Sequence, residues 1–226
     1  MKQLLLTVLF SVTLFFSALT QNCADFYFFQ NNKTVNLTLY NSKGEENGKK
    51  IYVVSNVQTQ GATTSSTVNS ELYNGKGKLQ AKGVNTMQCT GGVMLMDIRM
   101  TLSDQQQKQL ANATAKTDNV FIEYPAGMKE GDNLKDASLH MDLTVNNSPE
   151  TVDMNITNRK VAAKEKITST AGSWDCFKIT YTSKVMIKVM GIGVPVSIDV
   201  TEWFCPQFGV IKTETKYGST LVTSIN

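Results

Sequence analysis

The chain has 226 residues, with 22 Lys and Arg against 19 Asp and Glu, and a formal net charge of +3. The basic residues are nearly all lysine, since Arg99 and Arg159 are the only arginines, and no clustered basic face is visible. This composition argues against nucleic-acid binding. His140 is the only histidine, which excludes a histidine-based catalytic triad and a multi-histidine metal site within one chain.

The N-terminal segment, residues 1–21, has the composition of a secretory signal peptide. Lys2 precedes an apolar run at residues 4–16, and small or polar residues follow. The run is too short for a membrane span, and no second run of spanning length exists. We therefore expect an exported protein, periplasmic or associated with the cell envelope, whose mature part, residues 22–226, forms a single β-domain. Lipidation of Cys23 is an alternative, but the three residues before it are larger and more polar than we expect at such a site.

From residue 34 onward, apolar and polar residues alternate, which is typical of strands with one buried face. The candidate strands are residues 34–40, 51–57, 67–73, 78–89, 93–101, 120–124, 139–145, 151–161, 165–170, 174–190, 194–204, 209–216 and 220–225. Gly, Asn, Asp and Ser separate them, as in a meander. The pattern predicts a mainly β protein with a single curved antiparallel sheet, a half-barrel or open barrel of about 10–12 strands.

One segment departs from the alternation. Ser103 and Gln106 have the spacing of a capping box, in which the hydroxyl and the side-chain amide each bond the backbone of the other residue. Good helix formers follow. We therefore predict one short helix over residues 104–115, at the rim of the sheet because its apolar content is low.

The cysteines form an even set in a chain that we expect to be exported, which favours disulfides. They are Cys23, Cys89, Cys176 and Cys205. No C-x-x-C pair is present, which argues against a catalytic dithiol. The spacings also lack the close pairs that zinc sites use, so we expect no metal and no cofactor.

A hairpin register favours one pairing of these cysteines. If the strands that contain Cys176 and Cys205 turn at Met190-Gly191, the two residues lie opposite each other. A turn at Ile192-Gly193 would separate them, and Pro195 indicates an edge or bulged strand. We predict the first pairing, which leaves the other two cysteines as the second disulfide by elimination.

Several short motifs are shared with a known family. They are Asn158-Arg159-Lys160-Val161, the run from Ile167 to Cys176, Glu202-Trp203, the hairpin from Gly209 to Glu214, Tyr124-Pro125, Gly131, Leu134, Asp136-Ala137, and Tyr40 with Gly44. Together they resemble the DUF3108-like or TapB-like family of uncharacterised exported Bacteroidetes proteins, over essentially the whole mature chain. Cys205 departs from the pattern. The resemblance implies a fold similar to periplasmic lipoprotein carriers, whose half-barrel wraps a helix or an apolar ligand.

Methionines are concentrated on the apolar faces of the candidate strands. The candidate ligand-binding residues are Met94, Met96, Met100, Met141 and Met154. Methionine is flexible and polarizable, so a concave face lined by it suits varied apolar ligands. The alternative is that these residues only fill the core around the short helix.

Catalytic signatures are absent: the sequence has no G-x-S-x-G, H-E-x-x-H, P-loop or G-x-G-x-x-G motif. We therefore assign no catalytic residue and expect a non-enzymatic protein that binds a hydrophobic or lipid ligand, or an envelope protein. A structural or adhesive envelope protein that associates through strand edges is one alternative. The other is a glycan hydrolase that uses carboxylates, with candidates Asp97, Glu123, Asp142 and Asp153.

Overall fold

The structure, a computed structural model, describes residues 23–109, 114–116, 121–145 and 148–226. The predicted signal peptide, residues 1–21, lies outside these residues, as do residues 110–113 of the predicted helix. No helix in the described ranges is long and apolar enough to cross a membrane.

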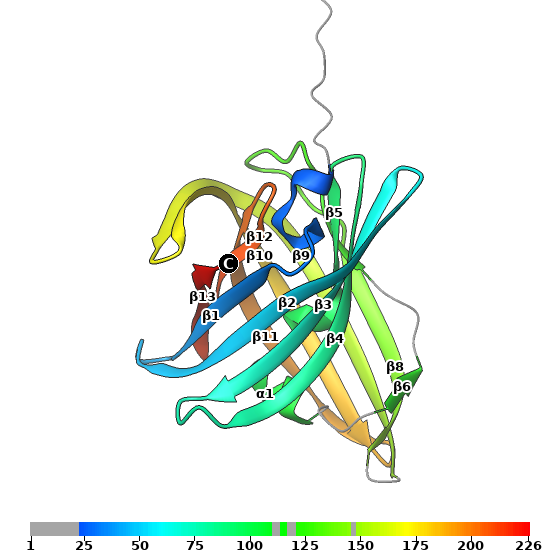
Figure 1. The fold of residues 1–226 in the computed structure, drawn as a ribbon. Helices are drawn as coiled ribbons and strands as arrows, with labels where there is room; N and C mark the ends of the chain where they lie inside the picture. The colour runs from blue at the N-terminus through cyan, green and yellow to red at the C-terminus, as the bar shows by residue number, and fades with distance from the viewer. Residues whose placement is uncertain (1–22, 110–113, 117–120, 146–147) are drawn as a thin grey trace, which may run out of the picture.

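One antiparallel sheet of thirteen strands makes up the described fold and curls on itself (Figure 1). The strands are β1 Thr34–Asn41, β2 Glu46–Gln60, β3 Thr63–Asn74, β4 Leu79–Thr90, β5 Val93–Asp97, β6 Thr114–Lys116, β7 Phe121–Tyr124, β8 Ala137–Val145, β9 Ser148–Ser169, β10 Gly172–Val189, β11 Ile192–Cys205, β12 Gly209–Thr215 and β13 Gly218–Ile225. Their order is β6-β8-β9-β10-β11-β12-β13-β1-β2-β3-β4-β5-β7. The predicted fold class is confirmed.

The first and last strands of the described sheet lie side by side. Val35 of β1 pairs with Ile225 of β13, and the pairing continues to Asn41 and Gly218. Because β1 also pairs with β2, the end of the chain completes the sheet beside its beginning. The edges are instead the short strands β6 and β7.

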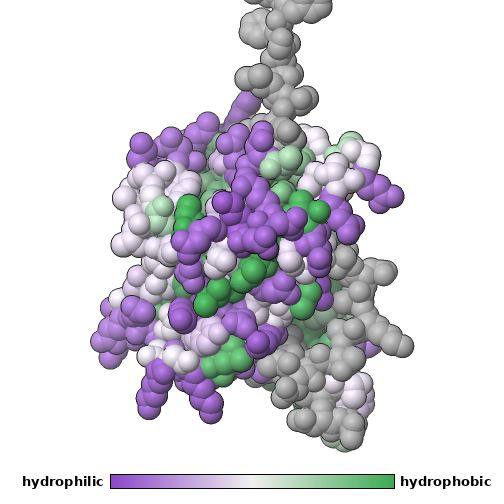
Figure 2. Space-filling model, in the orientation of Figure 1, coloured by the Kyte–Doolittle hydropathy of each residue, from purple (hydrophilic) through white to green (hydrophobic). Residues whose placement is uncertain are grey.

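Alternation places the apolar residues of each strand inside the curl. In β1, for example, Val35, Leu37 and Leu39 are buried, whereas their neighbours are partly exposed. The outer surface is accordingly polar: Figure 2 shows hydrophilic residues over most of one face, with apolar residues in small separate groups. A sheet with one wet and one dry face buries its core only by curling, because no second layer covers it.

Three predicted boundaries are wrong. The candidates 151–161 and 165–170 form one strand, β9, because bulges opposite Lys178–Thr182 let the ladder continue where alternation fails. The candidate 93–101 ends at Asp97, where the carboxylate accepts a hydrogen bond from the amide of Arg99 at 2.9 Å and starts a 3-10 helix, η3 (Ile98–Thr101).

The helix is the third correction. It is observed as α1, Asp104–Gln109, and residues 114–115 of the predicted helix belong to β6 instead. The capping box that begins it is present: the amide of Ser103 donates to Oε1 of Gln106 at 2.8 Å, and the amide of Gln106 donates to Oγ of Ser103 at 3.4 Å. The strand pairing of β6 with β8 outweighs helix propensity at residues 114–116.

The hairpin of β10 and β11 turns at Met190-Gly191, as the cysteine register requires. Val189 pairs with Ile192, and the two turn residues have φ values of 51° and 82°. Positive φ at both positions is the geometry of a tight two-residue turn whose twist suits a hairpin. The structure contains a disulfide between Cys176 and Cys205, with their Cα atoms 4.2 Å apart.

The N-terminal half of β11, residues 192–199, extends beyond its neighbour β12. Pairing with β12 begins only at Val200, so residues 192–199 have a free edge in the described part of the sheet. Pro195 lies within this half, in agreement with the expected edge position, because proline has no N–H to donate. Ile192 and Val194 are 80% and 78% exposed there.

Aromatic residues fill one end of the curled sheet. They lie in the 3-10 helix η2 (Tyr27–Phe29) and at its N-cap, just after the 3-10 helix η1 (Cys23–Asp25), at the end of the sheet opposite α1 in Figure 1. We call Phe26, Phe28 and Phe29, which are buried, the aromatic plug. A second disulfide, Cys23–Cys89, ties the plug to β4. The sequence analysis assigned no element to this segment.

A candidate ligand pocket

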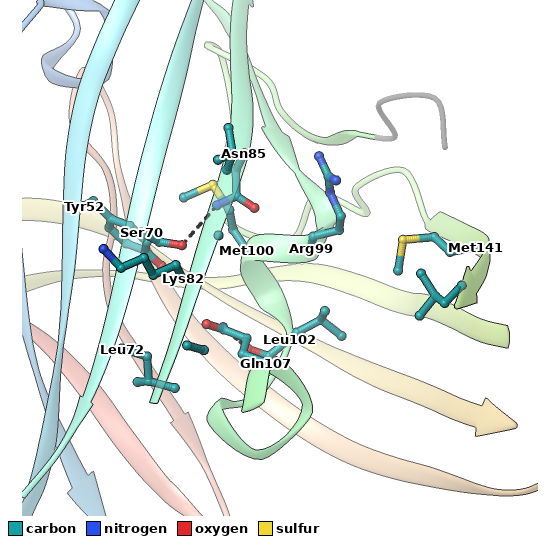
Figure 3. Close-up of a pocket in the computed structure, with 14 residues that line it drawn as sticks. Tyr52, Ser70, Leu72, Lys82, Asn85, Arg99, Met100, Leu102, Gln107 and Met141 are labelled. Atoms are coloured by element: carbon teal, nitrogen blue, oxygen red, sulfur yellow. Dashed lines mark hydrogen bonds between the residues drawn. The ribbon is translucent and has the colours of Figure 1, made fainter. Parts of the chain in front are cut away.

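A pocket of about 240 Å³ lies inside the sheet at the end opposite the aromatic plug. Strands β2, β3 and β4 form one wall, β8 forms another, and η3 and α1 lie between them. The residues that line it are Tyr52, Ser70, Leu72, Ala81, Lys82, Gly83, Val84, Asn85, Arg99, Met100, Leu102, Gln107, Met141 and Leu143 (Figure 3).

The pocket exists because small residues face inward on β3 and β4. Ser70, Ala81 and Gly83 occupy positions where neighbouring strands of the sheet carry larger apolar side chains. A Cβ built at Gly83 would lie 2.7 Å from Oγ of Ser70, so a side chain at this position would require the serine to move. Missing side-chain volume at three adjacent positions leaves a hollow instead of a packed core.

Two ion pairs hold the segment that covers the pocket. The buried carboxylate of Asp97 contacts the side chain of Arg99, which follows it in η3. Nζ of Lys50, an inward residue of β2, lies 3.3 Å from Oδ1 of Asp104 at the start of α1. Burial opposes the charge on Lys50, but Tyr52 and Asp104 outweigh it and raise the pKa of the amine. α1 is therefore anchored to β2 across the pocket.

Uncharged polar groups project among the apolar side chains of the pocket. Nδ2 of Asn85 donates to the carbonyl of Val68 and to Oγ of Ser70, both at 3.4 Å (Figure 3). Nε2 of Gln107 donates to the carbonyl of Leu102 at 2.7 Å. The two amide oxygens accept no hydrogen bond from any described residue, so each retains acceptor capacity toward the pocket.

The candidate methionines occupy two kinds of place. Met100, from η3, and Met141, from β8, line the pocket. Met94, Met96 and Met154 lie in the continuous core and are at most 7% exposed. Met100 does not continue the strand face of Met94 and Met96, because β5 ends at residue 97 instead of at the predicted residue 101. A role in ligand binding stays a prediction.

A buried polar cluster that no sequence pattern predicted is formed by Tyr124, Arg159, Tyr181 and Glu202. The hydroxyl of Tyr181 donates to Oε2 of Glu202 at 3.2 Å, and the guanidinium of Arg159 lies 5.1 Å from the ring centroid of Tyr124. Burial raises the pKa of Glu202, although Arg159 opposes this effect. Tyr124, Arg159 and Glu202 all belong to the family motifs, which was the signal that could have linked them.

This polar cluster is enclosed and does not open into the pocket. Phe204 stacks on Tyr124 with the ring centroids 4.3 Å apart, and Nη1 of Arg159 donates to the carbonyl of Lys135 at 2.8 Å. Arg159 and Glu202 are each 1% exposed. The cluster therefore links β7, β9, β10 and β11 within the core, and its position indicates a structural role.

The four candidate carboxylates do not form a common site. Asp97 is buried inside the sheet with Arg99, whereas Glu123 is at the surface with Nζ of Lys135 at 2.8 Å from its carboxylate. Asp142 and Asp153 flank His140, whose Nδ1 lies 2.6 Å from Oδ1 of Asp153 and whose Nε2 lies 3.5 Å from Oδ1 of Asp142. Within the described residues, no group of three or more His, Cys, Asp or Glu side chains could hold a metal ion.

The curled antiparallel sheet, its two disulfides and its pocket define a class of disulfide-containing β-proteins with a hollow at one end. Within this class, the chain belongs to the DUF3108-like family, whose match covers residues 30–224. The resemblance to that family is thereby confirmed. No match is found among curated proteins.

Two solved structures have a similar fold. A hypothesised exported protein with a YmcC-like fold from Bacteroides fragilis superposes with a TM-score of 0.71 at 18% identity, over 89% of this chain and 98% of that one. A hypothesised lipoprotein from Parabacteroides distasonis gives 0.72 at 21% identity, over 89% and 99%. At these identities the likeness establishes the shared fold alone.

These findings bear on the compartment and on Cys23. The descriptions of the two similar proteins and the presence of disulfides are consistent with an exported protein. In this chain Sγ of Cys23 is bonded to Cys89. The same sulfur cannot carry a lipid thioether while that disulfide is present, so the structure disfavours the lipidation alternative.

Proposed function

We propose that this protein is a non-enzymatic binder of a hydrophobic or amphipathic ligand, and that the pocket beside α1 is its binding site. The main support for this proposal is the difference between the two ends of the sheet. The aromatic plug fills one end, and small residues leave a hollow at the other. The volume is slightly below the roughly 300–1,000 Å³ of sites for drug-sized ligands. A short alkyl chain, or one end of a longer one, fits this description.

The chemistry of the lining supports binding rather than catalysis. It contains no Asp, Glu, His or Cys, the residues that most often act as nucleophiles, acids or bases. The polar side chains of the lining are hydroxyls, amides and two ion-paired cations, Lys82 and Arg99. Such groups orient a ligand, and no activated nucleophile is formed among them.

A pocket-filling variant tests the proposal. Ala81 faces inward and is 7% exposed, so Ala81→Phe places a ring in the hollow. Leu79 lies on the same strand, is 39% exposed and does not line the pocket, so Leu79→Phe serves as the control. With decanol as the probe in isothermal titration calorimetry, we expect saturable one-to-one binding by the native protein and the control, and at least about tenfold weaker binding by Ala81→Phe.

Equal affinity of Ala81→Phe and the native protein would show that the alcohol binds elsewhere and would refute the assigned site. No saturable binding to the native protein would refute the function itself. Circular dichroism of the variants checks that the sheet is intact in each.

A second function, association through strand edges, is favoured by the free edge of β11 and its exposed Ile192 and Val194. Sedimentation equilibrium of the native protein and of Ile192→Ser/Val194→Ser tests its simplest form, self-association. A mass that rises with concentration only in the native protein supports this function. A constant monomer mass in both argues against it.

A further inference from the structure

We propose that the pocket selects an amphiphile with an uncharged head group over one with a carboxylate or an ammonium group. This inference rests on the proposed function, because it specifies the ligand of the same site. It follows from the charges around the pocket: each cation there already has a carboxylate partner, and no acid lines the pocket.

Among the charged residues that line the pocket, Arg99 is the first candidate for a counter-ion to an anionic head group. Its Nε lies 2.8 Å and 3.0 Å from the two carboxylate oxygens of Asp97, and its Nη2 contacts the same group. The side chain of Asp97 is fully buried and that of Arg99 is 27% exposed, so water reaches only the arginine and screens the pair in part. The guanidinium is therefore neutralised before a ligand arrives.

The two lysines near the pocket are compensated in the same way. Lys50 is paired with Asp104 at 3.3 Å. Lys82 is paired with Glu71 at 2.7 Å, and its side chain is 66% exposed, so its amine stays in solvent. Every described cation near the pocket therefore already has a carboxylate partner.

A charged head group would lose its water and gain no full counter-charge in return. The desolvation of an ion costs several kcal/mol after relaxation, whereas an uncharged hydroxyl needs only hydrogen-bond partners. The free acceptor capacity of Asn85 and Gln107 and the hydroxyl of Ser70 supply such partners. A hydroxyl head can donate to the two amide oxygens, an ester head can accept from the hydroxyl of Ser70, and neither leaves a charge unpaired.

A head-group series at constant chain length tests the inference on the native protein. We expect decanol to bind at least about tenfold more tightly than decanoate or decylamine at pH 7, by isothermal titration calorimetry. Equal or tighter binding of either charged ligand would overturn the inference while leaving the proposed function intact. If none of the three binds, the inference and the proposed function both fail.

The pH dependence provides a second measurement without mutation. A fatty acid is increasingly protonated as pH falls toward the pKa of its carboxyl group, about 4–5. If the neutral form is the ligand, the apparent affinity for decanoate rises on the order of tenfold or more between pH 7 and pH 5, and that for decanol does not. An unchanged or lower affinity for decanoate at pH 5 would contradict the inference.

A variant that removes the carboxylate partner of Arg99 tests whether charge compensation causes the preference for an uncharged head group. Asp97→Asn leaves Arg99 without its carboxylate, so the decanoate-to-decanol affinity ratio is expected to rise about tenfold. Asp142→Asn, an exposed carboxylate away from the pocket, is the control and leaves the ratio unchanged. A folded Asp97→Asn protein with an unchanged ratio would count against charge compensation by Asp97. The head-group series remains decisive if this variant does not fold.

Discussion

Glu202 carries a carboxyl group into the core, where it accepts one hydrogen bond from Tyr181. Burial raises the pKa of this group in the folded state, so ionisation disfavours folding. The penalty is absent below the pKa of the unfolded chain and grows as pH rises through the folded pKa. Arg159 reduces the penalty without removing it.

The stability of Glu202→Gln relative to the native protein should therefore increase as pH rises. At pH 7.5 we expect the free energy of unfolding to be equal to or greater than the native value, since glutamine keeps the acceptor for Tyr181 and cannot ionise. At pH 4 the advantage disappears. Urea denaturation at both pH values measures this. A loss of more than about 1 kcal/mol at pH 7.5 would mean that attraction to Arg159 outweighs burial.

His140 offers a titration that can be observed directly, because it is the only histidine. Its hydrogen bond to Asp153 is the main cause of a raised pKa. In tag-free protein, the imidazole resonance should titrate above the usual value of about 6.5 in NMR spectra, and Asp153→Asn should lower the midpoint. An unchanged midpoint in that variant would exclude the bond in solution.

The same raised pKa gives a sign for stability. The contribution of His140 is present below its unfolded pKa and is lost as pH rises through the folded value. Thermal unfolding of His140→Gln should therefore show a smaller decrease of Tm across that interval than the native protein. The effect is small, since the imidazole is mostly exposed.

At the scale of elements, the two disulfides restrain different parts of the sheet. Cys23–Cys89 spans 66 residues and attaches the aromatic plug to β4, whereas Cys176–Cys205 spans 29 residues within one hairpin. Closing a longer loop removes more entropy from the unfolded chain. The chain-entropy relation gives about 4.4 kcal/mol for the first and about 3.6 kcal/mol for the second.

Replacement of each pair by alanine should lower the free energy of unfolding, and Cys23→Ala/Cys89→Ala should have the larger effect. Urea denaturation under non-reducing conditions compares the two double variants with the native protein. The opposite order would show that local packing around Cys176 outweighs loop length. Equal migration of native and variant proteins on non-reducing gels would contradict the disulfides themselves.

Sequence patterns predicted elements well where one periodicity was uninterrupted. The hairpin of β10 and β11 was predicted to its turn residues, because alternation, the glycine of the turn and the two cysteines agree. The start of α1 was predicted from its capping box. Its end was not, since the pairing of β6 with β8 is a long-range contact. The aromatic plug was not predicted, because residues 26–29 show neither the alternation of a strand nor the spacing of a helix.

The candidate site was harder to predict than the strands that build it. Met100 and Met141 were identified as apolar residues on inward faces, but the hollow depends on the small residues Ser70, Ala81 and Gly83. Their effect appears only when strands distant in sequence are brought together around one volume. A buried cluster such as that of Arg159 and Glu202 is likewise invisible to periodicity, because alternation does not report what lies across the curl.

At the scale of the whole molecule, closure depends on the last strand. Residues 218–226 supply β13, which pairs with both β12 and β1. Their deletion should remove cooperative unfolding, because it exposes the edges of two strands and the core beneath Val222. Thermal scans and the dispersion of amide NMR signals measure this loss. A truncated protein that melts cooperatively near the native Tm would contradict it.

A matched circular permutant separates connectivity from composition. Linking Asn226 to Cys23 and opening the chain in the exposed turn between β3 and β4 keeps every strand. A short linker can join these ends, since the hydroxyl of Tyr27, four residues after Cys23, donates to the carbonyl of Asn226 at 2.7 Å. We expect this permutant to fold with the native spectrum.

The pairing of β1 with β13 also determines the order in which the strands can pair during folding. A chain is made, and crosses any pore, from its N-terminus, so β1 emerges first on that side but meets one of its two partners only when the final residues arrive. Until then β1 has an open edge, and the aromatic plug lacks Phe208, which packs edge-on against Phe28 with the ring centroids 5.9 Å apart. The sheet therefore closes around its core only after the complete chain has been released. A chain that ends before β13 exposes unpaired strand edges to proteases.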